Sequence, residues 1–440
     1  MNARRTILVG MLQETGHLNP TFKLMRTLRG RGHRVVYSAI PDLEAHIQAQ
    51  GFETLSWFPE LFPNGSIRAQ AARGLLARRR AITERFEALT ERVVDGTGAA
   101  GHVAAAKPDL ILADIHEPHL ALLAKKLRIP LLTVNTSLPQ TKAQGVAPLR
   151  TPLPFEPTLK GRLRAELSWQ RFLASRRVGA KLADLIGMCP PYELARRMST
   201  RFGVAAAELD VETVYFPQLR STPEIVLCPE CFDFPRDVTP SRHYVESVDL
   251  ERQGQSFDFG RIPDDKPLVY CALGGQLYRP RQTPEFFRRM VQVFARKPEW
   301  RLLLSLGRHM SVGDLGRLPP NVHAMQSVPQ LAVLERARVM VTHGGLGSVK
   351  ECILFGVPMV VIPLAIDQPG NAARVVYHGI GVAGDVARSS VDELSALVTA
   401  ALTEPAFRAR IEAMQAQFRR LERATRGADL VETMLSQPSS

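Results

Sequence analysis

The sequence predicts an α/β protein built from two Rossmann-like domains with parallel sheets that face each other. Short apolar runs alternate with helical patterns in the N-terminal half, and the alternation restarts after a polar stretch at residues 251–266. Such alternation is typical of parallel sheets covered by helices. A chain of 440 residues is also too long for one ordinary domain. We therefore predict an N-terminal domain over residues 1–250 and a C-terminal domain over residues 251–440, with ligand between them.

Each predicted element rests on a local pattern. The helix at residues 20–29, for example, places Phe22, Met25 and Leu28 on one face. The predicted strands are residues 6–9, 34–40, 109–114, 130–134, 268–272, 302–306 and 339–341 and the apolar run that follows Gly356. The other predicted helices are residues 119–127 and 284–294, two longer Arg-rich segments at 66–95 and 160–205, and a long helical pattern from residue 405 onward.

The chain is strongly basic, with a net charge of +13. Arginine clusters at residues 78–80, 176–177 and 196–197 could attract nucleic acid or an anionic membrane. They lie in helical patterns with apolar residues between them, and no nucleic-acid-binding motif accompanies them. We expect no nucleic acid partner, whereas a peripheral contact with an anionic membrane stays open.

Metal binding, disulfides and membrane insertion have little support. Five cysteines are an odd number and too few for a disulfide scaffold. Cys228 and Cys231 form a lone C-x-x-C, and His116 and His119 form an H-x-x-H that has no evident third ligand, so no metal site is expected. No window approaches about 18 consecutive apolar residues, and no signal peptide is evident. We expect a cytoplasmic protein.

The most informative segment is residues 341–351, Val-Thr-His-Gly-Gly-Leu-Gly-Ser-Val-Lys-Glu. A strand ends there in a Gly-rich loop that leads into a helix, whose first backbone N–H groups attract a phosphate. Neither a G-x-G-x-x-G nor a Walker motif is present. A tight turn with a structural histidine is the alternative. The expected phosphate contacts are His343, Gly344, Gly345, Gly347 and Ser348.

Two pairs of polar residues near this loop have ordinary explanations as well. Ser348 and Glu351 fit a capping box, which needs no ligand. Glu351 also lies one helical turn from the predicted phosphate site, where a carboxylate can bind a ribose diol. Asp367 and Gln368 follow the next strand and can clamp sugar hydroxyls, although such pairs are common in loops. Both interpretations stay open on these residues alone.

His17 is the candidate general base. It lies at the mouth of the first strand, directly before a helix, and an imidazole there titrates near neutrality. We expect the helix N-terminus to keep it neutral and Asp114, at the end of another strand, to orient it. A base with an orienting acid resembles the logic of hydrolase triads, but no nucleophilic serine in a G-x-S-x-G context is present. The proton would then come from a bound acceptor.

Taken together, these motifs resemble the signature of the UDP-glycosyltransferase superfamily. The C-terminal motifs are Val328-Pro-Gln330, His343-Gly-Gly-Leu-Gly-Ser348, Glu351, Gly356-Val-Pro358 and Asp367-Gln368-Pro-Gly-Asn371. The N-terminal motifs resemble its bacterial macrolide-type branch, and they are Gly16-His17-Leu-Asn-Pro20, Arg31-Gly-His-Arg-Val35 and Pro108-Asp-Leu-Ile-Leu-Ala-Asp114. The resemblance is strongest over residues 1–55, 105–140 and 265–385.

The resemblance implies a GT-B fold and an inverting, metal-independent transfer of a hexose from a nucleoside diphosphate sugar to a hydroxyl group, with no further cofactor. It implies that His17 is the general base and that Asp114 orients it. It implies donor contacts to the diphosphate from His343, Gly344, Gly345, Gly347 and Ser348, to the nucleoside from Val328, Gln330 and Glu351, and to the sugar from Asp367 and Gln368.

Three positions depart from the family pattern. Gly347 stands where the family frequently has an asparagine, as in many bacterial members. Ser327 stands where the family commonly has a tryptophan that stacks on the nucleobase, so the choice between a UDP- and a TDP-sugar stays open. Gly275 stands where a serine is expected.

The acceptor is expected to be an apolar small molecule such as a polyketide, terpenoid or phenolic. This expectation rests on family habit and on the apolar residues Trp57, Phe58, Leu61 and Phe62. A membrane lipid or a carotenoid is the competing acceptor. A catalytically silent homologue that acts as a helper or binding protein is the alternative of another class, although such proteins usually lose the base or the phosphate-loop histidine. We expect a monomer or a homodimer.

Overall fold

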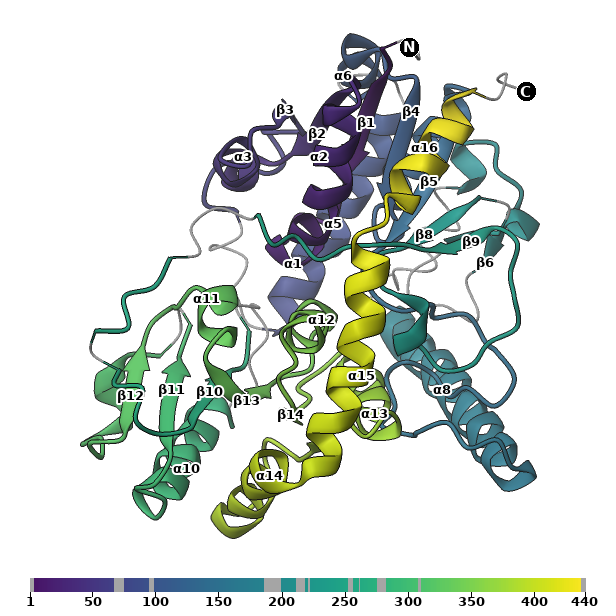
Figure 1. The fold of residues 1–440 in the computed structure, drawn as a ribbon. Coiled ribbons are helices and arrows are strands. Elements are labelled where there is room, and N and C mark those ends of the chain that lie inside the picture. The colour runs from purple at the N-terminus through teal and green to yellow at the C-terminus, as the bar shows by residue number, and fades with distance from the viewer. Residues whose placement is uncertain are drawn as a thin grey trace.

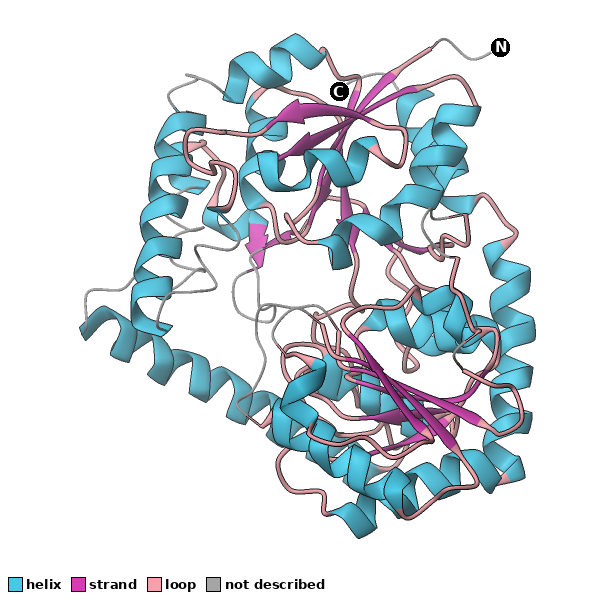
Figure 2. Ribbon diagram, turned by 90° about the vertical axis from the view of Figure 1, so that its left-hand side faces the viewer, coloured by secondary structure: helices cyan, strands magenta, loops and turns pink. Residues whose placement is uncertain are grey.

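The computed structural model describes residues 4–66, 75–94, 99–185, 199–210, 218–220, 222–251, 256–260, 262–274, 282–307 and 310–436. These residues form two α/β halves, each with one large sheet flanked by helices (Figures 1 and 2). No helix within these ranges is long and apolar enough to cross a membrane.

The N-terminal half contains a seven-stranded sheet in the order β3-β2-β1-β4-β5-β8-β9, with every pairing parallel. Its strands are β1 (Thr6–Gly10), β2 (Arg34–Ala39), β3 (Glu53–Ser56), β4 (Leu110–Asp114), β5 (Leu131–Asn135), β8 (Glu224–Val226) and β9 (Arg242–Tyr244). The four strands predicted in this half are confirmed to within one residue at each end. The other three were not predictable, because strands of three or four residues carry too little pattern.

The C-terminal half contains a six-stranded parallel sheet in the order β12-β11-β10-β13-β14-β15. Its strands are β10 (Leu268–Ala272), β11 (Arg301–Ser305), β12 (Val322–Met325), β13 (Ala337–Thr342), β14 (Met359–Val361) and β15 (Gly381–Ala383). The four strands predicted in this half are confirmed, and β12 and β15 are additional. The predicted α/β fold with two parallel sheets is therefore present.

Helices cover both sheets. In the N-terminal half they are α1 (Thr15–Leu18), α2 (Phe22–Gly30), α3 (Pro41–Gln48), α5 (Leu75–Val94), α6 (Ala99–Ala106), α7 (Pro118–Lys126) and α8 (Leu159–Leu185). In the C-terminal half they are α10 (Thr283–Ala295), α11 (Gln330–Leu334), α12 (Leu346–Phe355), α13 (Gln368–Tyr377) and α14 (Val391–Thr403). A short antiparallel pair, β6 (Leu209–Asp210) with β7 (Gln218–Leu219), completes the N-terminal half. Cys189, the arginine cluster at 196–197 and Gly275 lie outside the described residues.

The C-terminal helical segment returns to the N-terminal half. It consists of α15 (Pro405–Glu422) and α16 (Arg426–Ser436), drawn in yellow in Figure 1, and runs from one half to the other. Ala428 and Val431 of α16 are fully buried in the apolar core under the N-terminal sheet. The domain boundary predicted between residues 250 and 251 stays a prediction. Although α16 follows that boundary in the sequence, it packs on the N-terminal half.

The two halves share a continuous core. Val226 and Phe232 from the N-terminal half belong to the same buried apolar cluster as Val349 from α12. Charged side chains cross the junction as well. Lys350 of α12 is 2% exposed, and its Nζ donates to the backbone oxygen of Leu227 at 2.6 Å. Because the junction is apolar and hydrogen-bonded, it fixes the position of one half relative to the other.

Candidate active site

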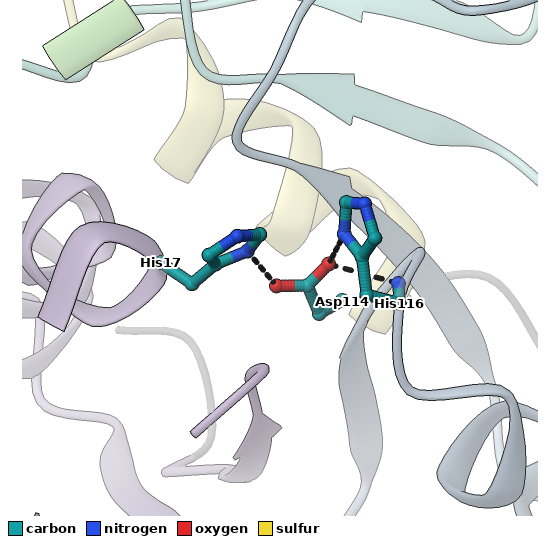
Figure 3. A group of neighbouring side chains, drawn as sticks. All are labelled: His17, Asp114 and His116. Carbon is teal, nitrogen blue, oxygen red and sulfur yellow. Dashed lines mark hydrogen bonds and ion pairs between the residues drawn. The ribbon is translucent and has the colours of Figure 1, made fainter. Parts of the chain in front are cut away.

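The order of the N-terminal sheet brings His17 and Asp114 together. β1 and β4 are parallel neighbours, so the segments that follow them meet at one edge of the sheet. His17 lies in α1, which follows β1, and Asp114 is the last residue of β4. The Nδ1 atom of His17 is 2.7 Å from Oδ2 of Asp114 (Figure 3). This arrangement leaves Nε2 as the basic nitrogen of the imidazole.

The carboxylate of Asp114 is buried, with 1% of the residue exposed, and each of its two oxygens takes part in two hydrogen bonds. Its Oδ2 also accepts from the backbone N–H of Leu12 at 3.2 Å, and its Oδ1 accepts from the backbone N–H and the Nδ1 of His116 at 2.9 and 2.7 Å (Figure 3). Burial by itself would raise the pKa of Asp114. The positive charges and hydrogen bonds of His17 and His116 outweigh burial and hold that pKa well below its usual range. Asp114 therefore stays ionised.

The pKa of His17 is raised above its ordinary value of 6.5. Burial lowers it, but the charge of Asp114, the hydrogen bond to Asp114 and the charges of Glu14 and Asp367 together outweigh burial. The hydroxyl of Thr136 also lies 2.8 Å from Nδ1. The expectation that a helix N-terminus keeps this imidazole neutral is wrong, because α1 is only four residues long and the carboxylates dominate.

The raised pKa predicts where activity falls at low pH. A base must be unprotonated, so we expect the acidic limb of kcat/KM to lie above pH 6.5. In Asp114→Asn the limb should move to lower pH, since the charge that raises the pKa of His17 is removed. The measurement is a pH profile of kcat/KM for both proteins, supported by NMR titration of the His17 ring. A limb below pH 6.5 in the native protein would contradict the assignment.

The Gly-rich loop leads directly into a helix start. α12 begins at Leu346 with Gly345 as its N-cap, and no side chain caps it, so its first backbone N–H groups face outward from the helix end. Gly344 has a φ of 80°, and a Cβ there would stand 2.6 Å from Cγ1 of Val361. The capping-box interpretation is wrong, because Ser348 lies inside the helix and not before it.

The ring of His343 lies against two glycines. A Cβ on Gly274 would come within 2.8 Å of its Cε1, and a Cβ on Gly345 within 2.6 Å of its Nε2. His343 is 8% exposed. At Gly347 a Cβ would meet no atom of the described residues within 4 Å. These glycines therefore let the imidazole lie across the helix start while the space beyond Gly347 stays open.

Three polar side chains beside the loop form one cluster. The Nε2 of Gln330 donates to Oε2 of Glu351 at 2.5 Å and to Oγ of Ser348 at 3.2 Å. Val328 is 8% exposed and belongs to the core, so its backbone and not its side chain is offered to a ligand. Ser327 is exposed. The residues predicted to meet the phosphate and the nucleoside are thus adjacent, with no aromatic ring at position 327.

The residues predicted to bind the sugar are joined to the same loop through Asn371. Its Nδ2 donates to the backbone oxygen of Gly344 at 2.9 Å and to Oδ2 of Asp367 at 3.0 Å. Burial raises the pKa of Asp367, although the hydrogen bond from Asn371 and the charge of His17 oppose this effect. The Oε1 of Gln368 accepts from two backbone N–H groups of the preceding loop at 2.8 and 3.0 Å. Its Nε2 is therefore the group that remains for a ligand.

Sequence reasoning missed four residues of this site: His116, Glu117, Thr136 and Asn371. For His116 a signal existed, because a residue two positions after an aspartate at a strand end often folds back onto its carboxylate. Glu117 starts α7 beside the dyad, and burial together with the charge of Asp114 raises its pKa to about 8. Thr136 contacts His17, and Asn371 contacts Gly344, only because folding brings together residues that are far apart in the sequence.

His17, Asp114 and His116 are also spaced like metal ligands, with the three ligand atoms within 4.8 Å of one another. Both imidazoles, however, already use Nδ1 to hydrogen-bond the carboxylate. His119, the other half of the H-x-x-H, is 2% exposed, and its Nε2 lies 3.1 Å from the hydroxyl of Thr90. The histidines of the H-x-x-H do not converge, and the hydrogen-bond pattern at Asp114 fits proton transfer.

Two other sequence interpretations can now be judged. Cys228 and Cys231 are free thiols, and burial raises the pKa of Cys231 to about 11, which fits structural cysteines. Trp57 and Phe58 are two of the four apolar residues on which the expected apolar acceptor rests. They are 4% and 0% exposed and belong to an apolar core under the N-terminal sheet. These two side chains therefore do not line an acceptor site, whereas Leu61 and Phe62 are only partly buried.

Fold and site together define the class of protein. Two parallel-sheet halves, with a hydrogen-bonded His–Asp pair at the edge of one and a Gly-rich helix start in the other, are the GT-B architecture of glycosyltransferases. The solved structure of the glycosyltransferase of kitacinnamycin has the same fold, with a TM-score of 0.72 and 28% identity over 99% of this chain and 100% of that one. CalG4, the calicheamicin glycosyltransferase, gives a TM-score of 0.69 at 23% identity, over the full length of both chains.

The chain belongs to the UDP-glycosyltransferase family, described as UDP-glucoronosyl and UDP-glucosyl transferase, whose model matches residues 56–417. It is a glycosyltransferase enzyme of the bacterial macrolide-type branch. The oleandomycin glycosyltransferase of Streptomyces antibioticus is 27% identical over 96% of this chain and 88% of that protein. The zeaxanthin glucosyltransferase of Pantoea ananas is 26% identical over 95% of this chain and 93% of that protein. As a member of this family, it uses a nucleotide sugar as co-substrate.

Proposed function

We propose that the protein transfers a hexose, with inversion, from a UDP- or TDP-sugar to a hydroxyl group of an apolar small molecule. One observation carries this proposal: Nδ1 of His17 is held 2.7 Å from the buried carboxylate of Asp114, which leaves Nε2 to take a proton. The charge of Asp367, from the C-terminal half, is among the causes that raise the pKa of His17. A sugar bound at Asp367 would therefore lie beside the base that activates the acceptor.

The donor would be held entirely by the C-terminal half. The diphosphate would meet His343, Ser348 and the backbone of Gly344, Gly345 and Gly347 at the start of α12, where the helix dipole favours an anion. Glu351 and Gln330 would bind the ribose and, with the backbone of Val328, the nucleoside. Asp367 and the Nε2 of Gln368 would hold the sugar hydroxyls.

Transfer would follow in one displacement. His17 Nε2 takes the proton from the acceptor hydroxyl while the acceptor oxygen attacks the anomeric carbon from the face opposite the diphosphate. The bond from that carbon to the diphosphate oxygen breaks, and the electron pair leaves with the nucleoside diphosphate. His343 and the helix start stabilise the developing charge. A single displacement inverts the configuration, and none of its proton or electron movements requires a metal ion.

The acceptor is proposed from the relatives and from one cavity. The kitacinnamycin and oleandomycin enzymes are named for natural products. Asp114 also lines a cavity of about 460 Å³, whose other lining residues include the apolar Ile115 and Leu122 and the charged Glu224 and Arg242. This volume is typical of small-molecule sites. The zeaxanthin enzyme is named for a carotenoid, so a carotenoid or lipid acceptor is the competing proposal.

The experiment is a release assay for the nucleoside diphosphate, run without acceptor over a panel of UDP- and TDP-sugars and in the presence of EDTA. We expect slow hydrolysis of one donor class, unchanged by EDTA, and faster release when a suitable phenolic or polyketide acceptor is added. No release from any donor would favour a silent helper protein. Activity that vanishes with EDTA and returns with Mg²⁺ would contradict the metal-independent mechanism.

We propose a cytoplasmic enzyme that acts as a monomer or homodimer.

A further inference from the structure

Helix α8 projects from the N-terminal half as a rod of 27 residues, at the lower right of Figure 1. It is attached near its N-terminal end. Among its described residues Gly161, Ala165 and Trp169 are buried, and the Nε1 of Trp169 donates to the backbone oxygen of Val146 at 2.8 Å. The opposite side of the helix is exposed along its whole length.

That exposed side carries six large apolar residues, each between 57% and 82% exposed: Leu159, Leu163, Leu167, Val178, Leu182 and Leu185. Steps of four residues, and the step of eleven from Leu167 to Val178, are close to whole turns of an α-helix, so these side chains form one stripe. An exposed apolar stripe of this length is unusual on a protein surface and marks an interaction site.

Cations accompany the stripe. The helix contains seven Lys and Arg residues against two acidic ones. Lys160, Arg164, Arg171, Arg177 and Lys181 are exposed and, at 100° per residue, fall on the same side as the leucines. Their long stems can lie along apolar surface while the charged ends remain in water or at anionic headgroups.

The positive charge of α8 indicates whether a second copy of the chain or a lipid bilayer binds its exposed side. Pairing two copies of α8 would bring two strongly basic helices together and would desolvate cations next to cations. A bilayer with anionic lipids accepts both features at once, because the leucines enter the acyl boundary and the cations meet the phosphates. We propose that the exposed side of α8 is a docking surface for an anionic lipid bilayer. This docking does not depend on the proposed reaction. It would bring the enzyme to apolar acceptors dissolved in the bilayer.

The test is co-sedimentation of the full chain with vesicles of phosphatidylcholine, with and without phosphatidylglycerol. Binding is expected only with phosphatidylglycerol and should weaken as salt rises. In the triple variant Arg171→Glu, Arg177→Glu and Lys181→Glu the partition coefficient should fall by at least on the order of a hundredfold, because each lost cation contributes roughly fivefold. The double variant Leu163→Asn and Leu167→Asn should lose at least about tenfold, since two apolar side chains no longer enter the bilayer.

The matched control reverses three exposed cations of the C-terminal half, Arg296→Glu, Arg317→Glu and Arg388→Glu, which changes the net charge equally. It should bind as the native protein does, and thermal melts followed by circular dichroism check that every variant is folded. Equal loss in the control, equal binding to neutral vesicles, or unaltered binding of both α8 variants would overturn the proposal. So would a dimer in light scattering that the Leu163→Asn and Leu167→Asn changes dissolve.

Discussion

Replacing His17 by alanine is expected to lower kcat for sugar transfer by roughly 10²–10⁴-fold, the usual contribution of a general base. The reason is geometric. His17 Nδ1 is fixed by Asp114 Oδ2 at 2.7 Å, which leaves Nε2 as the nitrogen that takes the proton of an acceptor. The KM for the donor should change little, because the proposed donor contacts all lie in the C-terminal half. The measurement is steady-state transfer with a fixed acceptor.

Three companion variants separate catalysis from folding. Asp114→Asn should also reduce kcat, since the buried amide cannot hold the imidazole as a carboxylate does. His343→Ala should slow release of the nucleoside diphosphate even without acceptor. His323→Ala, which removes a partly buried ring on β12, the edge strand of the C-terminal sheet, is the histidine control. Near-native transfer by His17→Ala would remove the base from the mechanism.

Replacing Asp233 by asparagine is expected to lower the free energy of unfolding by about 3–5 kcal/mol, as removal of one partner from a buried ion pair does. Asp233 and Arg374 are each 1% exposed at the side chain, and Oδ1 accepts from the Nε and Nη2 of Arg374 at 2.8 and 2.6 Å. Arg236 and Tyr244 bond the other oxygen at 2.9 and 2.7 Å. Without the carboxylate, the Arg374 guanidinium stays buried beside a second cation. Urea unfolding measures the loss.

The matched control is Glu53→Gln, which breaks the exposed pair with Arg34 and should cost less than about 1 kcal/mol. The triple variant Asp233→Leu, Arg236→Met and Arg374→Met should recover part of the lost stability, because neither guanidinium is then left buried without its carboxylate. Burial raises the pKa of Asp233, but the charges of Arg374 and Arg236 outweigh it and lower the pKa to about 2. The stabilisation is therefore present above the ordinary pKa of 3.8 and is lost as pH falls toward 2. Equal losses for Asp233→Asn and Glu53→Gln would contradict this account.

The sequence was sufficient to predict most of the architecture and the two parts of the site, which are His17 with Asp114 in the N-terminal half and the loop at His343 in the C-terminal half. Parallel strands can be recognised as apolar runs between helical patterns, and their C-terminal ends share one edge, so His17 and Asp114 could be paired without coordinates. The loop at His343 could be recognised in the same way, because three glycines at the junction of a strand and a helix need a reason. The start of α12 could not be predicted to the residue, since Ser348 and Gly345 are both acceptable N-caps.

What the sequence determined by itself is therefore local: a Gly-rich helix start, a histidine with an aspartate at neighbouring strand ends, and the two-sheet frame that carries them. Tertiary structure decided which charges are buried and which face water. It placed His116 on the free oxygen of Asp114, raised the pKa of His17 through carboxylates from separate segments, and sealed Arg374 against Asp233. Each of these depends on distance and burial between residues far apart in the chain, and the pattern of neighbours along the sequence contains neither quantity.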